Sequence, residues 1–311
     1  MAIFTSSDHL PEFENTVLTI GSFDGVHIGH RAILKEVVSK AREIGGQSVL
    51  LTFEPHPRKL IFPTQTLNVL TPLDTKLQLI TAAGIEHIVV QPFDHEFSSL
   101  SAEDYVLNFL VKNFNPHTVI IGYDHHFGHD RKGNIDVLKS YGTLHNFRVE
   151  ELSARLIDDA AVSSTKVRTA IRQGKVNEAQ AMLGRPYSLK GRVIHGQKLG
   201  RKLGYPTANI KPGNDDQLIP AIGIYAVKVN LDGQFFGGMM SIGKRPTVSE
   251  DEQIHLEVNL FDFDKDIYGH LPEIEFIDYL RDELKFENLE DLKKQIADDE
   301  HAARSVLKLN R

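Results

Sequence analysis

The chain has 311 residues, 41% of them hydrophobic and 25% charged, and carries a formal net charge of −7. This length predicts about two domains, and the composition is ordinary for a globular protein. The net negative charge argues against general nucleic-acid and membrane-surface binding, which use clustered positive charge. The absence of cysteine excludes disulfides and thiolate metal sites. No apolar stretch has membrane-spanning length, and residues 1–15 do not resemble a secretion signal. We therefore expect a cytoplasmic protein that binds neither nucleic acid nor membrane.

Short apolar segments alternate with helical patterns in the first half of the chain. Helices are expected at residues 32–44, after Pro72, and after Ser101, which can cap a helix together with Asp104. The apolar segments are rich in β-branched residues, which is typical of the buried strands of a parallel sheet; they cover residues 17–20, 48–53, 87–90 and 118–121. This alternation predicts a Rossmann-like, doubly wound α/β domain whose ligands bind at the carboxyl ends of the strands.

The segment 21–30, GSFDGVHIGH, connects the first of these strands to the first helix, and we call it the histidine turn. Its Asp-Gly pair permits tight backbone angles. The N–H groups and the dipole at a helix start favour an anion. His27 and His30 are three residues apart and can add donors on the same side, while the small Gly29 lets a nucleotide approach the backbone. The histidine turn is therefore predicted to bind phosphate.

Two further loops follow strands of the same predicted sheet. The first contains Pro55, His56 and Pro57, and the second covers residues 122–128, GYDHHFG. Because such loops converge at one edge of a sheet, all three loops could line one crevice. The second loop and the residues after it could form a metal site, a polar loop or a nucleotide-binding loop. The place of the loop at a strand end favours nucleotide binding. The polar side chains concerned are His125, His126, His129 and Asp130.

Residues 163–168, SSTKVR, begin another helix. An N-cap accounts for one of the three hydroxyl groups. The other two, followed by Lys166 and Arg168, are consistent with a second phosphate site. Both interpretations remain open at this point.

The composition changes after Leu183, so we expect domains at 1–183 and 184–311. Between Glu178 and Asp215 there are basic residues but no acidic ones. A solvated basic face is one explanation. Glycines interleaved with cations favour a phosphate site instead, and the residues concerned include Gly196, Gly200, Arg201 and Gly204. Thr207 and Asn209 follow and offer oxygen ligands suited to Mg²⁺. The spacing is not that of a Walker loop.

The rest of the second half alternates with a period of two. Residues 224–242 read as a hairpin that turns at Asp232-Gly233, and residues 254–260 read as another strand. Residues 288–309 have a helical apolar stripe whose acidic residues are expected to form a solvated face. The pattern predicts an antiparallel β-barrel with a C-terminal helix. Glu257, within the second of these strands, is either a surface residue or the group that orients and deprotonates an acceptor hydroxyl.

Taken in order, these motifs resemble those of the prokaryotic bifunctional riboflavin kinase/FAD synthetase family. The histidine turn resembles its adenylyltransferase signature, and the loops at 55–57, 122–128 and 163–168 recur in the same order. Residues 200–209, GRKLGYPTAN, resemble its kinase signature, and residues 242–247 and 256–260 resemble later motifs. The resemblance spans nearly the whole chain. It departs at Asn259, where many relatives carry histidine, and at His126, where arginine is common.

The resemblance implies two reactions. The second domain would transfer the γ-phosphate of ATP to riboflavin, giving FMN and ADP. The first would join FMN to the AMP part of a second ATP, giving FAD and pyrophosphate. Glu257 would be the base of the kinase, Thr207 and Asn209 would hold Mg²⁺, and His27 and His30 would stabilise charge on the transferring phosphate.

The resemblance also implies binding residues. Nucleotide or phosphate would contact Gly21, Phe23, Asp24, Gly29, Asp124, Ser164, Thr165, Arg168, Gly196, Gly200, Arg201 and Gly204. The flavin would contact Pro55, His56, Pro57, Asn259 and Arg281. Protein partners are left open.

Two alternatives remain. The literal His-Ile-Gly-His string also suggests a class I aminoacyl-tRNA synthetase, which would need an amino-acid pocket and a tRNA-binding surface. The other alternative is a flavin- or nucleotide-binding regulator that has lost catalysis.

Overall fold

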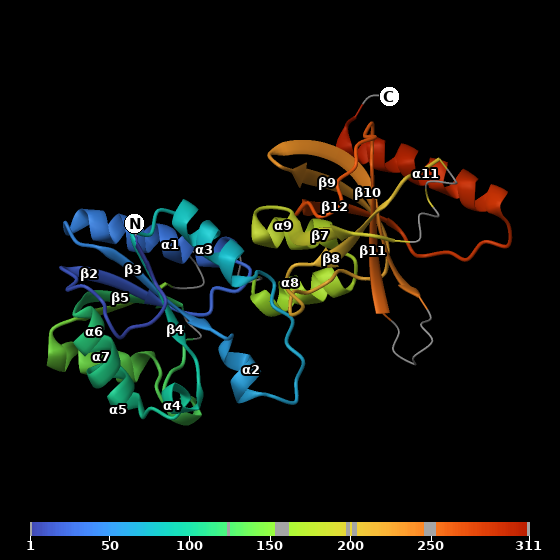
Figure 1. Ribbon diagram of the computed structural model, residues 1–311. Coiled ribbons are helices and arrows are strands. Elements are labelled where there is room, and N and C mark those ends of the chain that lie inside the picture. Colours follow the sequence, from blue (N-terminus) through green and yellow to red (C-terminus); the bar gives the residue numbers. More distant parts are fainter. Residues whose placement is uncertain are drawn as a thin grey trace. The chain divides into compact units, whose positions relative to one another are not determined.

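The computed structural model describes residues 2–122, 125–152, 162–196, 200, 204–245 and 253–309. The chain forms two compact units, Met1–Ser164 and Thr165–Arg311 (Figure 1). The domain boundary expected after Leu183 divides the chain differently, because it assigns the helices after Ser164 to the first domain, and it stays a prediction.

The first unit contains a six-stranded parallel sheet with the strand order β1-β4-β3-β2-β5-β6 (Figure 1). Its strands are β1 (Ala2–Phe4), β2 (Thr16–Ile20), β3 (Ser48–Glu54), β4 (His87–Pro92), β5 (Pro116–Gly122) and β6 (Arg148–Leu152). In the central register Leu18 lies opposite Val49 of β3 and Val119 of β5. The predicted doubly wound α/β fold is confirmed, and β1 and β6 are additions to the expected strands.

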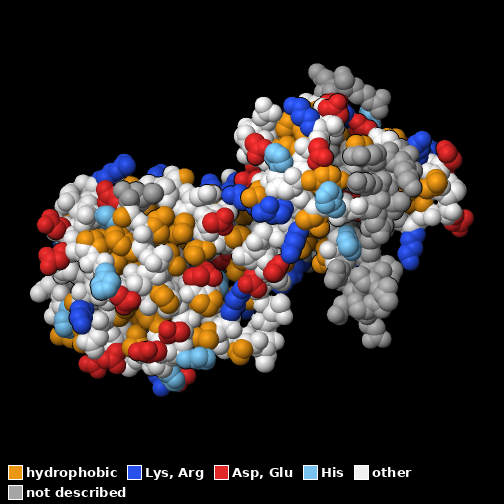
Figure 2. Space-filling model, in the orientation of Figure 1, with side chains coloured by type: hydrophobic (Ala, Val, Ile, Leu, Met, Phe, Trp, Pro, Cys, Tyr) orange, Lys and Arg blue, Asp and Glu red, His pale blue; other side chains and the backbone are white. Residues whose placement is uncertain are grey.

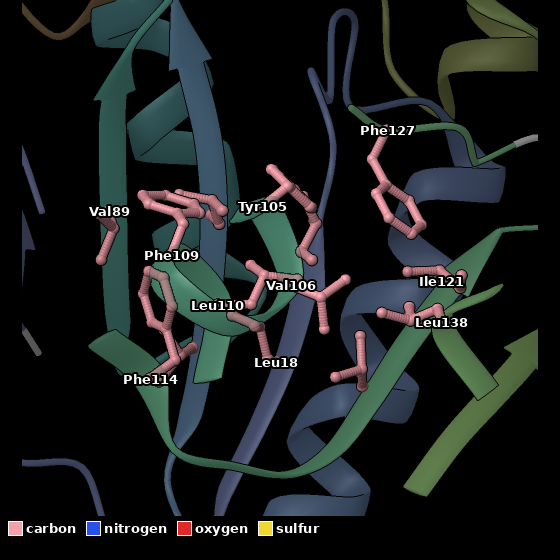
Figure 3. Close-up of a cluster of buried hydrophobic side chains, with 14 of the residues drawn as sticks. Leu18, Val89, Tyr105, Val106, Phe109, Leu110, Phe114, Ile121, Phe127 and Leu138 are labelled. Carbon is pink, nitrogen blue, oxygen red and sulfur yellow. The ribbon is translucent and has the colours of Figure 1, made fainter. Parts of the chain in front are cut away.

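Hydrophobic clusters cover both faces of this sheet. Successive strand residues point to opposite faces, so Leu18 belongs to one cluster and Val17 to the other. Helices α1 (Ile28–Glu43) and α3 (Leu73–Ala82) pack on the Val17 side. The π-helix η1 (Tyr105–Val111) and α7 (Ile135–His145) cover the Leu18 side, as Figure 3 shows for Tyr105 and Leu138. Full burial of one such leucine or phenylalanine contributes about 1.5–3 kcal/mol.

Short helical elements connect the strands. They are α2 (Pro57–Ile61), α4 (His95–Ser98), α5 (Ala102–Asp104), α6 (Lys112–Phe114) and the 3-10 turn η2 (His129–Arg131). The expected cap at Ser101 is confirmed, because its hydroxyl oxygen accepts from the Asp104 N–H at 3.0 Å.

The second unit is a closed antiparallel barrel in the order β10-β11-β8-β7-β12-β9. Its strands are β7 (Tyr187–Ile194), β8 (Ala208–Pro212), β9 (Gly223–Leu231), β10 (Gln234–Arg245), β11 (Gln253–Leu260) and β12 (Glu273–Arg281). Helices α8 (Ser164–Arg172) and α9 (Val176–Leu183) precede the barrel, and α11 (Leu289–Leu307) follows it. The predicted barrel with a C-terminal helix is confirmed.

The acidic residues of α11 do not all form a solvated face. Asp299 is buried, and its carboxylate forms a bidentate ion pair with Arg281 of β12, at 2.7 Å from Nε and 2.6 Å from Nη2. This pair joins the helix to the barrel. The expectation was wrong at this position because helical periodicity does not reveal a partner on a distant strand.

On the face seen in Figure 2, acidic, basic and hydrophobic side chains are interspersed over the first unit. None of the described helices combines the length and the apolar character needed to cross a membrane.

Candidate functional site

The histidine turn occupies the switch point of the parallel sheet. From the central strand β2 the chain continues to β3 and β4 on one side, and β5 and β6 lie on the other. Crevices form at such reversals, beyond the carboxyl ends of the strands. The turn begins where Gly21 donates its N–H to the Leu51 carbonyl of β3 at 3.0 Å. The predicted loop therefore lies where an open α/β sheet binds ligands.

Three residues of the turn have left-handed backbone angles: Phe23 (φ +47°), Gly25 (φ +86°) and Val26 (φ +40°). Glycine adopts them readily, whereas a β-branched valine is strained there. The side chains of Phe23 and Val26 are buried, and this packing holds the turn. The Phe23 ring also lies over Gly21, where an added Cβ would be 3.2 Å from Cε2.

Asp24 connects the turn to the start of α3. Its carboxylate accepts from the Leu70 N–H at 2.9 and 3.1 Å and from the Thr71 N–H at 3.1 Å. The side chain is buried, with 2% of the residue exposed. Asp24 thus holds two backbone groups of the structure, and its predicted contact with nucleotide stays a prediction.

The two histidines lie face to face at the start of α1. Their ring centroids are 3.6 Å apart and the rings are 16° from parallel. His27 is the N-cap, and its Nδ1 accepts from the His30 N–H at 3.3 Å. Because Nδ1 is the acceptor, a neutral His27 carries its proton on Nε2. Gly29 is buried in the same turn of helix.

The electrostatic environment keeps His30 neutral. Burial is the main reason that its pKa lies well below the ordinary 6.5, and the neighbouring His27 and Lys76 lower it further. Its Nδ1 is enclosed and has no hydrogen-bond partner among the described residues. A neutral imidazole can donate one hydrogen bond to a phosphate oxygen without adding a positive charge.

Sequence reasoning missed Lys76. This lysine of α3 is 5% exposed, and its ammonium group reaches the Ser22 carbonyl within the histidine turn at 3.3 Å. The signal was present, because Lys76 is three residues after Leu73 and four before Ile80, within the apolar stripe of the helix.

The structure also brings Ser164 to the histidine turn. Its hydroxyl donates to the Asp24 carbonyl at 2.9 Å, although the two residues are 140 positions apart. Thr165 is exposed on α8 and Arg168 is buried, but both belong to the second unit. Their predicted contact with phosphate stays a prediction, and Asp124 lies outside the described residues.

The proline loop follows β3 at the same edge of the sheet. His56 caps α2 by accepting from the Arg58 N–H at 3.2 Å, and Pro57 is the first residue of that helix. Pro55 is exposed and follows a cis peptide bond. The loop is thus placed at a ligand-binding edge, and its flavin contacts stay predictions.

The histidine cluster after β5 does not assemble a metal site within the described part of the chain. His129 instead approaches Asp130, with Nδ1 at 3.2 Å from Oδ2. Asp130 also approaches Lys132 at 3.6 Å. The metal interpretation therefore finds no support in the described geometry.

The second unit brings Glu257, Thr207 and Asn209 together. Glu257 of β11 lies directly opposite Asn209 of β8 in the antiparallel ladder, so the two side chains share a face. The Thr207 hydroxyl donates to Glu257 Oε2 at 3.0 Å. Since its proton is directed to the carboxylate, the hydroxyl lone pairs face elsewhere and can bind a cation. A hydroxyl, an amide oxygen and a carboxylate form a donor set that suits Mg²⁺.

The glycines before Thr207 allow close approach to these residues. A Cβ at Gly196 would be 2.1 Å from the Asn209 Nδ2, and one at Gly200 would be 2.3 Å from the Tyr205 carbonyl oxygen. Gly204 has a left-handed φ of +88°. A Cβ at Gly196 would displace the Asn209 side chain, one at Gly200 would displace the loop backbone, and Gly204 suits its left-handed angle. Arg201 lies outside the described residues.

A cavity of about 420 Å³ opens beside Thr207. Its lining includes Thr207, Val258 and residues 263–268. Its volume is in the usual range for small-molecule sites. Thr207 therefore borders a space large enough for part of a nucleotide or a flavin, and the strand neighbours of Glu257 and Asn209 line it as well.

Two predicted flavin contacts of this unit have structural partners. The buried Asn259 donates from Nδ2 to the Pro206 carbonyl at 2.7 Å, which holds the residue before Thr207 in place. Arg281 is engaged with Asp299 and with the Asp282 carbonyl. The flavin contacts of both residues stay predictions.

Comparisons with known proteins agree with both halves of this description. The family profile described as FAD synthetase matches residues 9–166, and the one described as riboflavin kinase matches residues 183–307. Proteins named bifunctional riboflavin kinase/FMN adenylyltransferase are similar over nearly the whole chain. The Pseudomonas fluorescens protein is 40% identical over 296 residues, which is 95% of this chain and 94% of its own. The Listeria monocytogenes protein is 39% identical over 292 residues, which is 94% of this chain and 92% of its own.

The fold recurs in a solved structure. A crystal structure from Streptococcus pneumoniae, described as a macrolide-efflux protein, superposes with a TM-score of 0.87 and 30% sequence identity. The match covers 97% of this chain and 98% of that one. The likeness therefore includes both units.

Proposed function

The chain belongs to the bifunctional riboflavin kinase/FMN adenylyltransferase family, and from this premise we propose that it performs both reactions. The second unit phosphorylates riboflavin with ATP to give FMN and ADP. The first unit then transfers AMP from a second ATP to FMN, giving FAD and pyrophosphate. Membership of this family removes the aminoacyl-tRNA synthetase alternative.

In the adenylyl transfer, a phosphate oxygen of FMN attacks the α-phosphorus of ATP and pyrophosphate leaves. The FMN phosphate is ionised near neutral pH, so the step needs no strong base. The histidines instead donate hydrogen bonds to the phosphoryl oxygens, where negative charge builds up in the transition state. Two features support this role: His27 carries its proton on Nε2, and His30 remains neutral.

In the kinase reaction, Glu257 accepts the proton of the riboflavin hydroxyl as that oxygen attacks the γ-phosphorus. The hydrogen bond from Thr207 orients the Glu257 carboxylate. Thr207 and Asn209 would hold Mg²⁺, which supplies charge neutralisation for the phosphates when bound. The glycine loop would let the phosphates approach the backbone.

One observation carries the proposal: the two sets of reactive residues lie in different units. His27 and His30 belong to the first unit, and Glu257 with Thr207 belongs to the second. The two activities should therefore be separable by single substitutions.

The test follows flavins by chromatography after incubation with ATP and Mg²⁺. His30→Ala should lower conversion of FMN to FAD roughly 10²–10³-fold, the usual effect of removing one such donor, and leave riboflavin phosphorylation intact. Glu257→Gln should lower FMN formation by about 10²–10⁴-fold while supplied FMN is still converted to FAD. His95→Ala and Glu290→Gln, at exposed positions, are the matched controls.

The outcomes separate the remaining alternatives. A wild-type protein that binds flavin and ATP but makes neither FMN nor FAD would be a regulator, and the proposal would fail. Loss of both activities in either variant would indicate a folding defect or a shared site. A His30→Ala protein that makes FAD at the wild-type rate would exclude the donor role. The cytoplasmic location stays a prediction, as does the lack of nucleic-acid partners.

A further inference from the structure

Lys76 is a buried cation beneath the histidine turn. Its Nζ donates to the Ser22 carbonyl at 3.3 Å, to the Thr52 hydroxyl oxygen at 3.1 Å and to the Phe53 carbonyl at 3.4 Å. The Thr52 hydroxyl in turn donates to the Ser22 carbonyl at 3.3 Å. One amino group thereby links α3, the end of β3 and the histidine turn.

The hydrogen-bond pattern identifies the charged form. An ammonium group has three N–H donors and a neutral amine has two, and Lys76 has three acceptors. Burial lowers its pKa from 10.5, while the negative charges of Glu54 and Asp24 oppose that shift. The three acceptors therefore match the three donors of the protonated lysine.

No carboxylate within the described ranges lies within ion-pair distance of this ammonium group. Glu54 and Asp24 act on the ammonium group through their charge, and the Asp24 carboxylate already accepts from the Leu70 and Thr71 N–H groups. Burying a cation without a paired anion is costly, and a methionine would fill a similar volume more cheaply. A buried charge of this kind beside a candidate site indicates that the charge has a function there.

The position of the cation indicates that use. Ser22 lies between Gly21 and Phe23, so a hydrogen bond to its carbonyl fixes the turn that carries the histidines. The positive charge of Lys76 also lowers the pKa of His30, although burial and His27 contribute more to that shift. Both effects act at the place where the triphosphate of ATP is proposed to bind.

We propose that Lys76 is a positioning residue for adenylyl transfer, which holds the histidine turn by its Ser22 contact and supplies a fixed positive charge beneath the transferring phosphate. The inference rests on the proposed function of the first unit. Lys76 itself does not touch the reacting atoms, because its three donors are used by the protein. It acts through the backbone it fixes and through its field.

The experiment compares Lys76→Met, Lys76→Gln and Lys76→Arg in the full chain. Lys76→Met should lower kcat for FAD formation by about 10–100-fold, less than loss of a direct donor. The KM for FMN should change less than about threefold, because a misplaced turn affects the transition state more than ground-state binding. Riboflavin phosphorylation by the second unit serves as the internal control for folding and concentration. Lys35→Met, on the exposed side of α1, is the matched lysine control.

Charge and packing are separated by the other two variants. Lys76→Arg keeps a cation and should retain at least tenfold more activity than Lys76→Gln, which keeps hydrogen-bond donors but no charge. A purely structural lysine would give equal rates in these two variants at matched thermal stability, and that result would overturn the proposal. If Lys76→Met does not fold, the comparison of arginine with glutamine still decides.

A pH profile adds a second readout. The titratable groups facing Lys76 are Asp24, Glu54 and His30, and His27 faces His30. Because Lys76 lowers the pKa of His30, its removal should raise that pKa, so the acid-side fall in FAD formation should move to higher pH in Lys76→Gln. An unchanged acid limb together with an unchanged kcat refutes the proposal. Failure of the wild-type protein to make FAD would instead refute the proposed function, so the two failures are distinguishable.

Discussion

Replacement of Asp24 by asparagine tests whether this residue supports the histidine turn or contacts the nucleotide. The carboxylate accepts from two backbone N–H groups, those of Leu70 and Thr71, and the residue is 2% exposed. Asparagine has nearly the same shape but only one acceptor oxygen. Its NH₂ group would face an N–H donor, which leaves one buried backbone group without an acceptor.

The expected loss follows from these contacts. A hydrogen bond to a charged group contributes about 1.5–3 kcal/mol, and a buried donor left unpaired costs about 1–3 kcal/mol. The single asparagine oxygen can retain one bond, so we expect the free energy of unfolding of the first unit to fall by about 2–4 kcal/mol. For a unit of this size each kcal/mol corresponds to roughly 2–4 °C in Tm, which gives a drop of about 5–15 °C.

The assay is thermal unfolding followed by far-UV circular dichroism, because the chain has no tryptophan. FAD formation is measured on the same samples below the unfolding transition. Asp74→Asn, at an exposed position in the first turn of α3, is the control and should cost at most about 1 kcal/mol. An Asp24→Asn protein with wild-type stability and a raised KM for ATP would refute this reasoning and favour direct contact with nucleotide.

The remaining predictions concern the barrel and the acid stability of the first unit. Arg281→Met should lower the stability of the second unit by about 3–5 kcal/mol in urea unfolding, because it leaves the buried Asp299 carboxylate without a cation, although Gln295 still donates to it; a loss smaller than 1 kcal/mol would contradict this. Gly196→Ala should reduce FMN formation and spare FAD formation, because the added Cβ would be 2.1 Å from the Asn209 Nδ2; equal kinase rates would show that the loop adapts. The lowered pKa of His30 means that the unfolded chain binds the proton more readily, so this residue makes stability fall as pH drops below about 6.5. His30→Gln should make unfolding measured between pH 7 and pH 5 less pH-dependent, and an unchanged slope would exclude this contribution.

Much of the fold follows from local signals. The hairpin of β9 and β10 was expected from alternation and from Asp232-Gly233, and both turn residues adopt left-handed angles, at φ +52° and φ +86°. The cap at Ser101 follows from residues three positions apart. Such features depend on backbone preferences and short-range periodicity, so they can be recognised in the sequence itself.

For the two sites, the reactive residues could be predicted from the sequence, but their hydrogen-bond partners could not. The sequence alone predicted which residues carry the chemistry, because the histidine turn and the Thr207–Asn209 motif are contiguous. It also determined that the motifs occur in an order typical of a two-activity enzyme. Their partners depend on tertiary structure: Asp24 accepts from a residue 46 positions away, and Lys76 donates to one 54 positions away.

Lys76 is the clearest case. A lysine within the apolar stripe of a helix predicts that its side chain is buried, but the sequence does not show which groups accept its hydrogen bonds. The parallel sheet decides its role, because adjacent strands bring the Ser22 and Phe53 carbonyls to the same edge, where α3 crosses. Local preference and motif order in the sequence were enough to predict the two fold classes, and they also predict the reactive residues. Which polar groups support these residues depends on the tertiary structure, because buried donors and acceptors are paired by proximity in space.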